Sequence, residues 1–155
     1  MAKQIYVLRA DLVGFRGVHR TIAVRGDQTL VDVHYALQAA FDWDDDHLYS
    51  FWLDGKFWSR DGREYTHPFQ ARQPSPLGSF ARGPAPWSAD TPLSRLKLTK
   101  GQRIAYLFDF GDEWRVRLTV RQITADDGHT YPRHLESVGD APPQYPDFED
   151  VEEVA

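Results

Sequence analysis

The sequence predicts an α+β fold, with a mixed, mainly antiparallel sheet of about five to six strands covered by one main helix. Three observations support this prediction. Several short segments have the apolar pattern of strands, one segment repeats apolar residues at helical spacing, and turn residues separate these segments. With 155 residues, 41% of them hydrophobic and 14% aromatic, the chain can form one domain over residues 1–155.

Residues 4–14 and 18–26 predict a β-hairpin that turns through the glycine-containing stretch GFRG. The first strand is apolar on both sides, which indicates an inner position in the sheet. In the second strand, Arg20 shares a face with Ile22 and Val24.

The next segment predicts the main helix, with a cap at Asp27 or Thr29 and an end near Asp42. Its apolar residues recur at helical spacing: Leu30, Val33, Leu37, Ala40 and Phe41. A second hairpin is predicted over residues 48–59, because Asp54-Gly55 is a strong signal for a two-residue turn.

Residues 61–95 contain six of the ten prolines and predict a long irregular excursion. Its aromatic and apolar residues are expected to fold it onto the domain: Phe69, Leu77, Phe80 and Trp87. Residues 100–123 have the strongest strand pattern, and RIAYLF, apolar on both faces, suits a central strand. The remaining residues predict loops, at most one short helix, and a frayed acidic tail over 146–155. The opening order of strand, strand, helix and strand resembles a β-grasp core, in which the last strand lies centrally.

The stretch FDFGDEW, residues 108–114, places three carboxylates beside three aromatic rings. An odd-numbered loop such as Gly111-Asp112-Glu113 would put both apolar rows on the core side; the rows are Ile104, Tyr106, Phe108 and Phe110, and Trp114, Val116, Leu118 and Val120. In that register Asp109 points away from the core and faces Arg115. Two interpretations are open: a cross-strand ion pair, which the absence of a linked third ligand favours, or carboxylates that converge on a metal or a proton.

The acidic run after the helix contains Asp44, Asp45, Asp46 and His47. Oxygen-rich runs can bind divalent cations, but this spacing departs from the calcium-loop pattern, so a solvated loop is the better interpretation. The six histidines form no recognised zinc-binding pair, and cysteine is absent. No metal site, cofactor or catalytic residue is therefore predicted.

The net charge of −5 opposes nucleic-acid binding by the whole surface, but the charge is uneven. One candidate basic edge consists of Arg16, Arg20 and Arg25, and a second lies on a strand with Arg115, Arg117 and Arg121. No apolar run is long enough for a signal peptide or a membrane span. We expect a cytoplasmic protein without a membrane partner.

Three segments carry a family resemblance: VHRTIAVRGDQTLVDVHYALQAAFDWDDDHLYSFWLDG, YLFDFGDEWRVRLTV and YPRHLESVGDAPP. In this order they resemble the plasmid pRiA4b ORF-3-like family of small bacterial proteins, some of which are labelled insertion-element passenger or resolvase-like. The resemblance implies an α+β fold and no established reaction. This chain departs from the family pattern, because His19 precedes Arg20 where a tryptophan is typical. Many relatives carry cysteines in the region of His134, Ala141 and Tyr145, so any thiolate metal site of those relatives is absent here.

These observations favour a non-enzymatic binding or accessory protein whose partner is a protein or a nucleic acid of plasmid or mobile-element biology. Its candidate binding surface comprises Asp45, Asp46, His47, Asp109, Asp112, Glu113, Trp114 and Arg115. The alternative is a metal-dependent enzyme that acts on nucleic acid or a phosphate ester through Asp109, Asp112 and residues 44–46.

Overall fold

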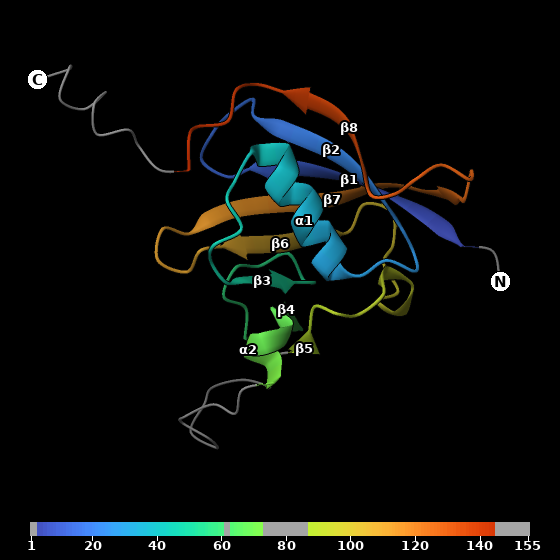
Figure 1. The fold of residues 1–155 in the computed structure, drawn as a ribbon, viewed down its shortest axis with the longest axis horizontal. Coiled ribbons are helices and arrows are strands. Elements are labelled where there is room, and N and C mark those ends of the chain that lie inside the picture. The colour runs from blue at the N-terminus through green and yellow to red at the C-terminus, as the bar shows by residue number, and fades with distance from the viewer. Residues whose placement is uncertain (1–2, 61–62, 73–86, 145–155) are drawn as a thin grey trace, which may run out of the picture.

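The backbone forms one sheet with a helix packed across one of its faces (Figure 1). The computed structural model describes residues 3–60, 63–72 and 87–144. In these residues the strands are β1 Gln4–Leu12, β2 His19–Arg25, β3 Tyr49–Trp52, β4 Glu64–Thr66, β5 Trp87–Ser88, β6 Arg103–Phe108, β7 Trp114–Ala125 and β8 Arg133–Val138. The helices are α1 Leu30–Phe41, α2 Pro68–Arg72 and a single 3₁₀ turn at Leu93–Arg95.

The strands follow the order β5-β4-β3-β6-β7-β1-β2-β8, and only the β4–β5 pair is parallel. The α+β class with a mainly antiparallel sheet is therefore confirmed. The predicted count of five to six strands is wrong, because the described sheet has eight. The Pro-rich excursion contributes the short strands β4 and β5, of which β5 forms one edge of the sheet, and the C-terminal segment, expected as loop, contributes β8 at the other edge. The β-grasp core is not confirmed, since the last strand lies at an edge and β1 pairs antiparallel with both β2 and β7.

The predicted hairpin over residues 48–59 is also wrong. A turn does form at Gly55, whose amide donates to the carbonyl oxygen of Trp52 at 3.2 Å. The chain then leaves the sheet, and β3 pairs with β4 on one side and β6 on the other. Residues 56–59 instead bring Phe57 and Trp58 against Trp52.

Helix α1 begins and ends where the sequence predicts. Thr29 caps it in a reciprocal box with Asp32: the Asp32 amide donates to the Thr29 hydroxyl at 3.4 Å, and the Thr29 amide donates to the Asp32 carboxylate at 2.8 Å. Asp42 ends the helix in the left-handed conformation, with φ 57°. The buried stripe of α1 lies against the sheet: Leu30, Val33, His34, Leu37, Gln38 and Phe41.

The main core lies between α1 and the sheet face that it covers. Tyr106 and Phe108 of β6 are fully buried there, beside Tyr49 and Phe51 of β3. A smaller apolar cluster lies on the opposite face, where Phe57 and Phe110 pack against Trp52, Ala105 and Leu107. Phe110 was expected in the core row; it belongs to this second cluster, because β6 ends at Phe108 and the chain turns.

Some predictions for the excursion and the tail fall outside the described residues, including those for Leu77, Phe80 and 146–155. Of the described residues in the excursion, Phe69 and Trp87 remain largely exposed, although Trp87 contacts Tyr65. None of the described helices has the length and apolar character needed to cross a lipid bilayer.

The docking of β8 on β2 depends on Gly139. This residue has φ 77°, and a Cβ placed there would collide with the carbonyl oxygen of Gly17. We expect Gly139→Ala to lower the free energy of unfolding by more than about 2 kcal/mol, the backbone strain of a positive φ plus the collision. Gly128→Ala is the matched control, because Gly128 has φ 80° in open space. Equal losses in chemical denaturation would contradict this account.

Candidate functional site

The register of the hairpin between β6 and β7 determines which side chains lie on each face of the sheet. Phe108 pairs with Trp114, and Tyr106 pairs with Val116, so the predicted apolar rows do share the covered face. The loop is odd-numbered, as predicted, but it has five residues, Asp109–Glu113. Because of this length, Leu107 rather than Asp109 lies opposite Arg115. The predicted pair between Asp109 and Arg115 is therefore wrong.

Asp109 organises the loop from within it. Its side chain is buried and accepts the backbone amides of Gly111 at 3.0 Å and Asp112 at 3.3 Å. Arg115 instead bonds to Glu113, with 2.6 Å between Nη2 and Oε1. The Arg115 and Trp58 donors lower the pKa of Glu113, since both stabilise its charged form.

The acidic run after α1 lies next to this loop. The His47 Nε2 atom is 3.3 Å from the second carboxylate oxygen of Asp109 and 3.5 Å from Asp46. Gln144 bonds to the same segment, donating to Asp46 at 3.1 Å and accepting the Asp44 amide at 2.6 Å. The structure thus joins the two acidic segments of the predicted surface through His47.

These contacts connect the two acidic segments within the fold. Within residues 3–60, 63–72 and 87–144, no three histidine or carboxylate side chains form a group that could hold a metal ion. Asp112 is exposed at the hairpin tip, while Trp114 is half-buried beside Trp43. A hollow of about 480 Å³, discussed below, lies elsewhere and is lined by none of the predicted acids.

A buried polar network that the sequence did not predict lies beneath this segment. His34 of α1 contacts the Tyr106 hydroxyl through Nδ1 and Asp45 through Nε2, both at 2.7 Å. Gln38 donates to the same Tyr106 oxygen at 3.0 Å, and the His34 ring stacks on Tyr49 with centroids 3.7 Å apart. The sequence did contain a signal, because His34 and Gln38 lie four residues apart on the apolar stripe of the helix.

The network has one consistent direction of hydrogen bonding. Ionised Asp45 can only accept, so His34 Nε2 carries the proton and Nδ1 accepts the Tyr106 hydroxyl proton. Burial lowers the pKa of His34 to about 4, although the bond to Asp45 opposes this shift. Burial also raises the pKa of Tyr106. His34 is therefore neutral near pH 7, as the network requires.

The three arginines of the first predicted basic edge do not form one exposed surface. Arg20 is buried and donates to the carbonyl oxygens of His19, Ala40, Val138 and Gly139 at 2.9–3.1 Å. It thereby ties β2 to the end of α1 and to β8. Arg25 bonds to Asp27 at 2.7 Å. Of these three arginines, only Arg16 is exposed without an ion pair to another described residue. The prediction that these three arginines form one continuous basic surface is therefore wrong.

The sheet face opposite α1, here called the open face, carries the second set of arginines. Alternation along the strands places Arg103 of β6 and Arg117 of β7 on this side, with Arg121 following Val120 at a bulge. All three are exposed, and they make no ion pair or hydrogen bond within the described residues. Two other arginines on this face are paired: Arg115 with Glu113 and Arg9 with Asp11.

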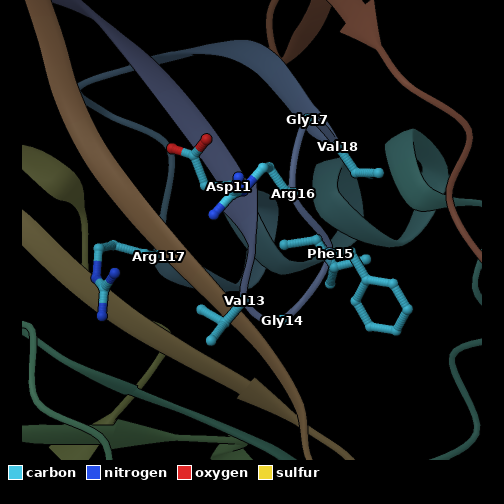
Figure 2. A pocket seen from close by; sticks show the side chains of 9 residues that line it. Asp11, Val13, Gly14, Phe15, Arg16, Gly17, Val18 and Arg117 are labelled. Carbon is cyan, nitrogen blue, oxygen red and sulfur yellow. The ribbon is translucent and has the colours of Figure 1, made fainter.

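A hollow of about 480 Å³ lies at one end of the open face (Figure 2). It is bounded by the loop over residues 13–17, by Asp11 and by Arg117. Figure 2 shows the Phe15 ring on the side of the loop away from Arg117. The hollow therefore extends the charged surface of β7 rather than forming an enclosed pocket.

The comparisons with known proteins agree with the resemblance seen in the sequence. The family described as Plasmid pRiA4b ORF-3-like protein matches residues 4–154. The chain belongs to this family. The match includes the open face, the polar network of α1 and the whole described sheet of this pRiA4b ORF-3-like protein.

Two similar proteins support the fold, but neither has a stated function. The uncharacterized protein y4hQ of Sinorhizobium fredii (strain NBRC 101917 / NGR234) is 30% identical over 128 residues, 82% of this chain. The chain spans only 58% of the length of that curated relative. The crystal structure of a protein of unknown function, MM3350 from Methanosarcina mazei Go1, has a TM-score of 0.70 and 25% identity. That match covers 99% of this chain and 82% of the other.

The buried histidine predicts a stability loss in mild acid. The unfolded chain binds a proton at His34 with the ordinary histidine pKa, whereas the folded protein resists it down to about 4. Between these values the unfolded state binds more protons, so stability is complete above the unfolded pKa and falls as the pH is lowered. From about pH 7.5 to about pH 5, the free energy of unfolding should fall by about 2 kcal/mol.

Urea unfolding of the wild type, His34→Gln and His129→Gln over this pH range tests the prediction. His34→Gln should remove most of the slope, while the exposed His129 serves as a control whose replacement preserves it. A slope that survives in His34→Gln would contradict the assignment.

Proposed function

We propose that this pRiA4b ORF-3-like protein is a non-enzymatic binding protein of the cytoplasm that binds nucleic acid through its open face. It would serve transactions of plasmid or mobile-element DNA. The observation that carries the proposal is the group of three exposed arginines that have no partner among the described residues, Arg103, Arg117 and Arg121. Unneutralised guanidinium groups on a broad face attract phosphates, which supply most of the affinity in nucleic-acid binding.

The spacing of the three arginines supports this proposal. Arg103 lies opposite Thr119, and Thr119 separates Arg117 from Arg121 along β7. The guanidinium groups therefore surround one small polar residue on two adjacent strands. A point cluster of this kind creates a local positive field although the whole chain has a net charge of −5.

The neighbouring ion pairs strengthen the contrast. Arg9 and Arg115 lie on the same face, but each already has a carboxylate partner at 3.1 Å and 2.6 Å. Such partners reduce the attraction for an added anion. Arg103, Arg117 and Arg121, which have no partner in the described part of the chain, thus mark the part of the face where a ligand phosphate would gain the most binding energy.

The predicted binding surface around the hairpin contributes less to this proposal. Glu113 and Arg115 border the open face, with Asp112 at the adjoining tip. His47, Asp46 and Asp109 are already engaged with one another. The metal-dependent alternative is not proposed, because internal hydrogen bonds occupy the carboxylates of Asp45, Asp46 and Asp109, on which it depends.

Fluorescence anisotropy with a labelled oligonucleotide, titrated at salt concentrations from about 50 mM to about 200 mM, tests the proposal. Replacing Arg103, Arg117 and Arg121 together by alanine should weaken binding strongly. The slope of log affinity against log salt should fall by about two, at roughly 0.7 per lost phosphate contact on a single strand. Arg95→Ala is the control, because Arg95 is an exposed arginine outside the sheet and should leave both quantities unchanged.

Three results would contradict the proposal. The first is the absence of salt-dependent binding, and the second is unchanged binding by the triple variant. The third is equally tight, arginine-dependent binding of a polyglutamate peptide of matched charge, which would indicate an acidic protein partner instead.

A further inference from the structure

A half-exposed tryptophan lies on the open face close to the arginines. Trp58 is 50% exposed, although large aromatic side chains usually bury most of their surface. It follows the turn at Gly55, in a segment that leaves the sheet after β3. Its exposure has no role in the core, because the cluster beneath it already contains Trp52, Phe57 and Phe110.

Contacts on several sides hold the Trp58 ring in place. Its centroid lies 5.4 Å from that of Trp52 and 5.7 Å from that of Phe110. The indole Nε1 donates to Glu113 Oε1 at 3.0 Å. Trp58 also has φ 58°, a conformation that costs a bulky residue energy and that these contacts maintain. The exposed ring is therefore a preorganised surface rather than a loosely held side chain.

The same contacts join Trp58 to the arginines of β7. The Glu113 carboxylate accepts a hydrogen bond from the Trp58 indole N–H and another from the Arg115 guanidinium. The Arg115 guanidinium in turn lies 5.1 Å from the centroid of Phe57. This arrangement neutralises the carboxylate nearest the ring, so an approaching phosphate meets little repulsion there.

Strand pairing shows how near Arg117, which has no partner among the described residues, lies to the aromatic cluster around Trp52. Trp52 pairs with Ala105, and Ala105 pairs with Arg117. Arg117 therefore lies directly opposite Ala105, a small member of the apolar cluster that lies between Arg117 and Trp52 on the open face. An extended ligand could contact the Trp58 ring and the Arg117 guanidinium together, since adjacent strands lie roughly 5 Å apart.

We infer that Trp58 stacks on a base of a single-stranded nucleic acid while Arg103, Arg117 and Arg121 contact its phosphates; this inference rests on the proposed function. An exposed ring beside unneutralised guanidinium groups matches the alternation of flat bases and charged phosphates along a single strand. A duplex keeps its bases stacked inside, so it would satisfy the arginines but leave Trp58 without a partner. The charge and the ring together therefore select the single strand.

The test compares two probes of about twelve units, an oligothymidylate and an abasic sugar-phosphate chain of equal charge. The wild type should bind oligothymidylate about tenfold more tightly than the abasic chain, with quenching of tryptophan fluorescence. Trp58→Ala should remove this difference without changing abasic binding, and Trp58→Phe should restore most of it. Trp87→Ala is the matched control, because Trp87 is 52% exposed but pairs with Tyr65 at the β4–β5 edge.

Equal binding of the two probes by the wild type would overturn the inference. So would a Trp58→Ala variant that weakens both probes alike or neither. Preferential binding of the oligothymidylate–oligoadenylate duplex would overturn it as well. None of these results removes the salt-dependent, arginine-dependent binding on which the proposed function depends. Loss of binding to every probe would instead refute the proposed function itself.

Discussion

The pairing of Phe108 with Trp114 is the constraint on which the rest of the structure depends. It fixes the register of β6 and β7, and strand alternation then assigns every neighbouring side chain to one face or the other. A slip of one residue would turn Arg115 and Arg117 toward α1 and expose the apolar row. Asp109 supports this register, because its carboxylate and carbonyl groups hold the amides of Gly111, Asp112 and Glu113 inside the loop.

The two faces that this register creates have different chemistry. The covered face buries aromatic rings and the polar network of His34 and Tyr106, in which each hydrogen bond has a single workable direction. The open face has a small apolar cluster at one end and arginines along β6 and β7. Because most buried polar groups on the covered face are paired within the fold, the proposed binding is assigned to the open face, where three arginines have no partner among the described residues.

Sequence patterns predicted the parts of the fold that local chemistry determines. The cap at Thr29, the end of α1 near Asp42 and the faces of β6 and β7 follow from side-chain types and spacing. The strands at and next to the sheet edges do not, since β4 and β5 have two or three residues and β8 is exposed along its length. Such strands form because a sheet edge offers them hydrogen bonds, and no periodic apolar signal marks them. The turn at Gly55 was recognised, but the long-range pairing of β3 with β4 replaced the expected hairpin.

The sequence predicted the positions of some residues of the candidate site but not of others. Arg20 shares a strand face with Ile22 and Val24, so its burial could have been inferred from alternation, whereas composition alone placed it with Arg16. Arg117 was named as part of a basic strand, and its exposure follows from the same alternation. The position of Trp58 beside these arginines depends on how the chain leaves β3, which no local pattern specifies.

The central claim is that the open face, rather than the helix side, binds nucleic acid. Its most direct test is a nuclear magnetic resonance titration of the labelled protein with a short single-stranded oligonucleotide, in which the arginine Nε–H and tryptophan indole signals are followed. The account predicts that Arg103, Arg117, Arg121 and Trp58 shift together, while Arg95 and Trp87 stay unchanged. Shifts confined to α1 or to the segment around His47, with the four open-face signals unmoved, would contradict it.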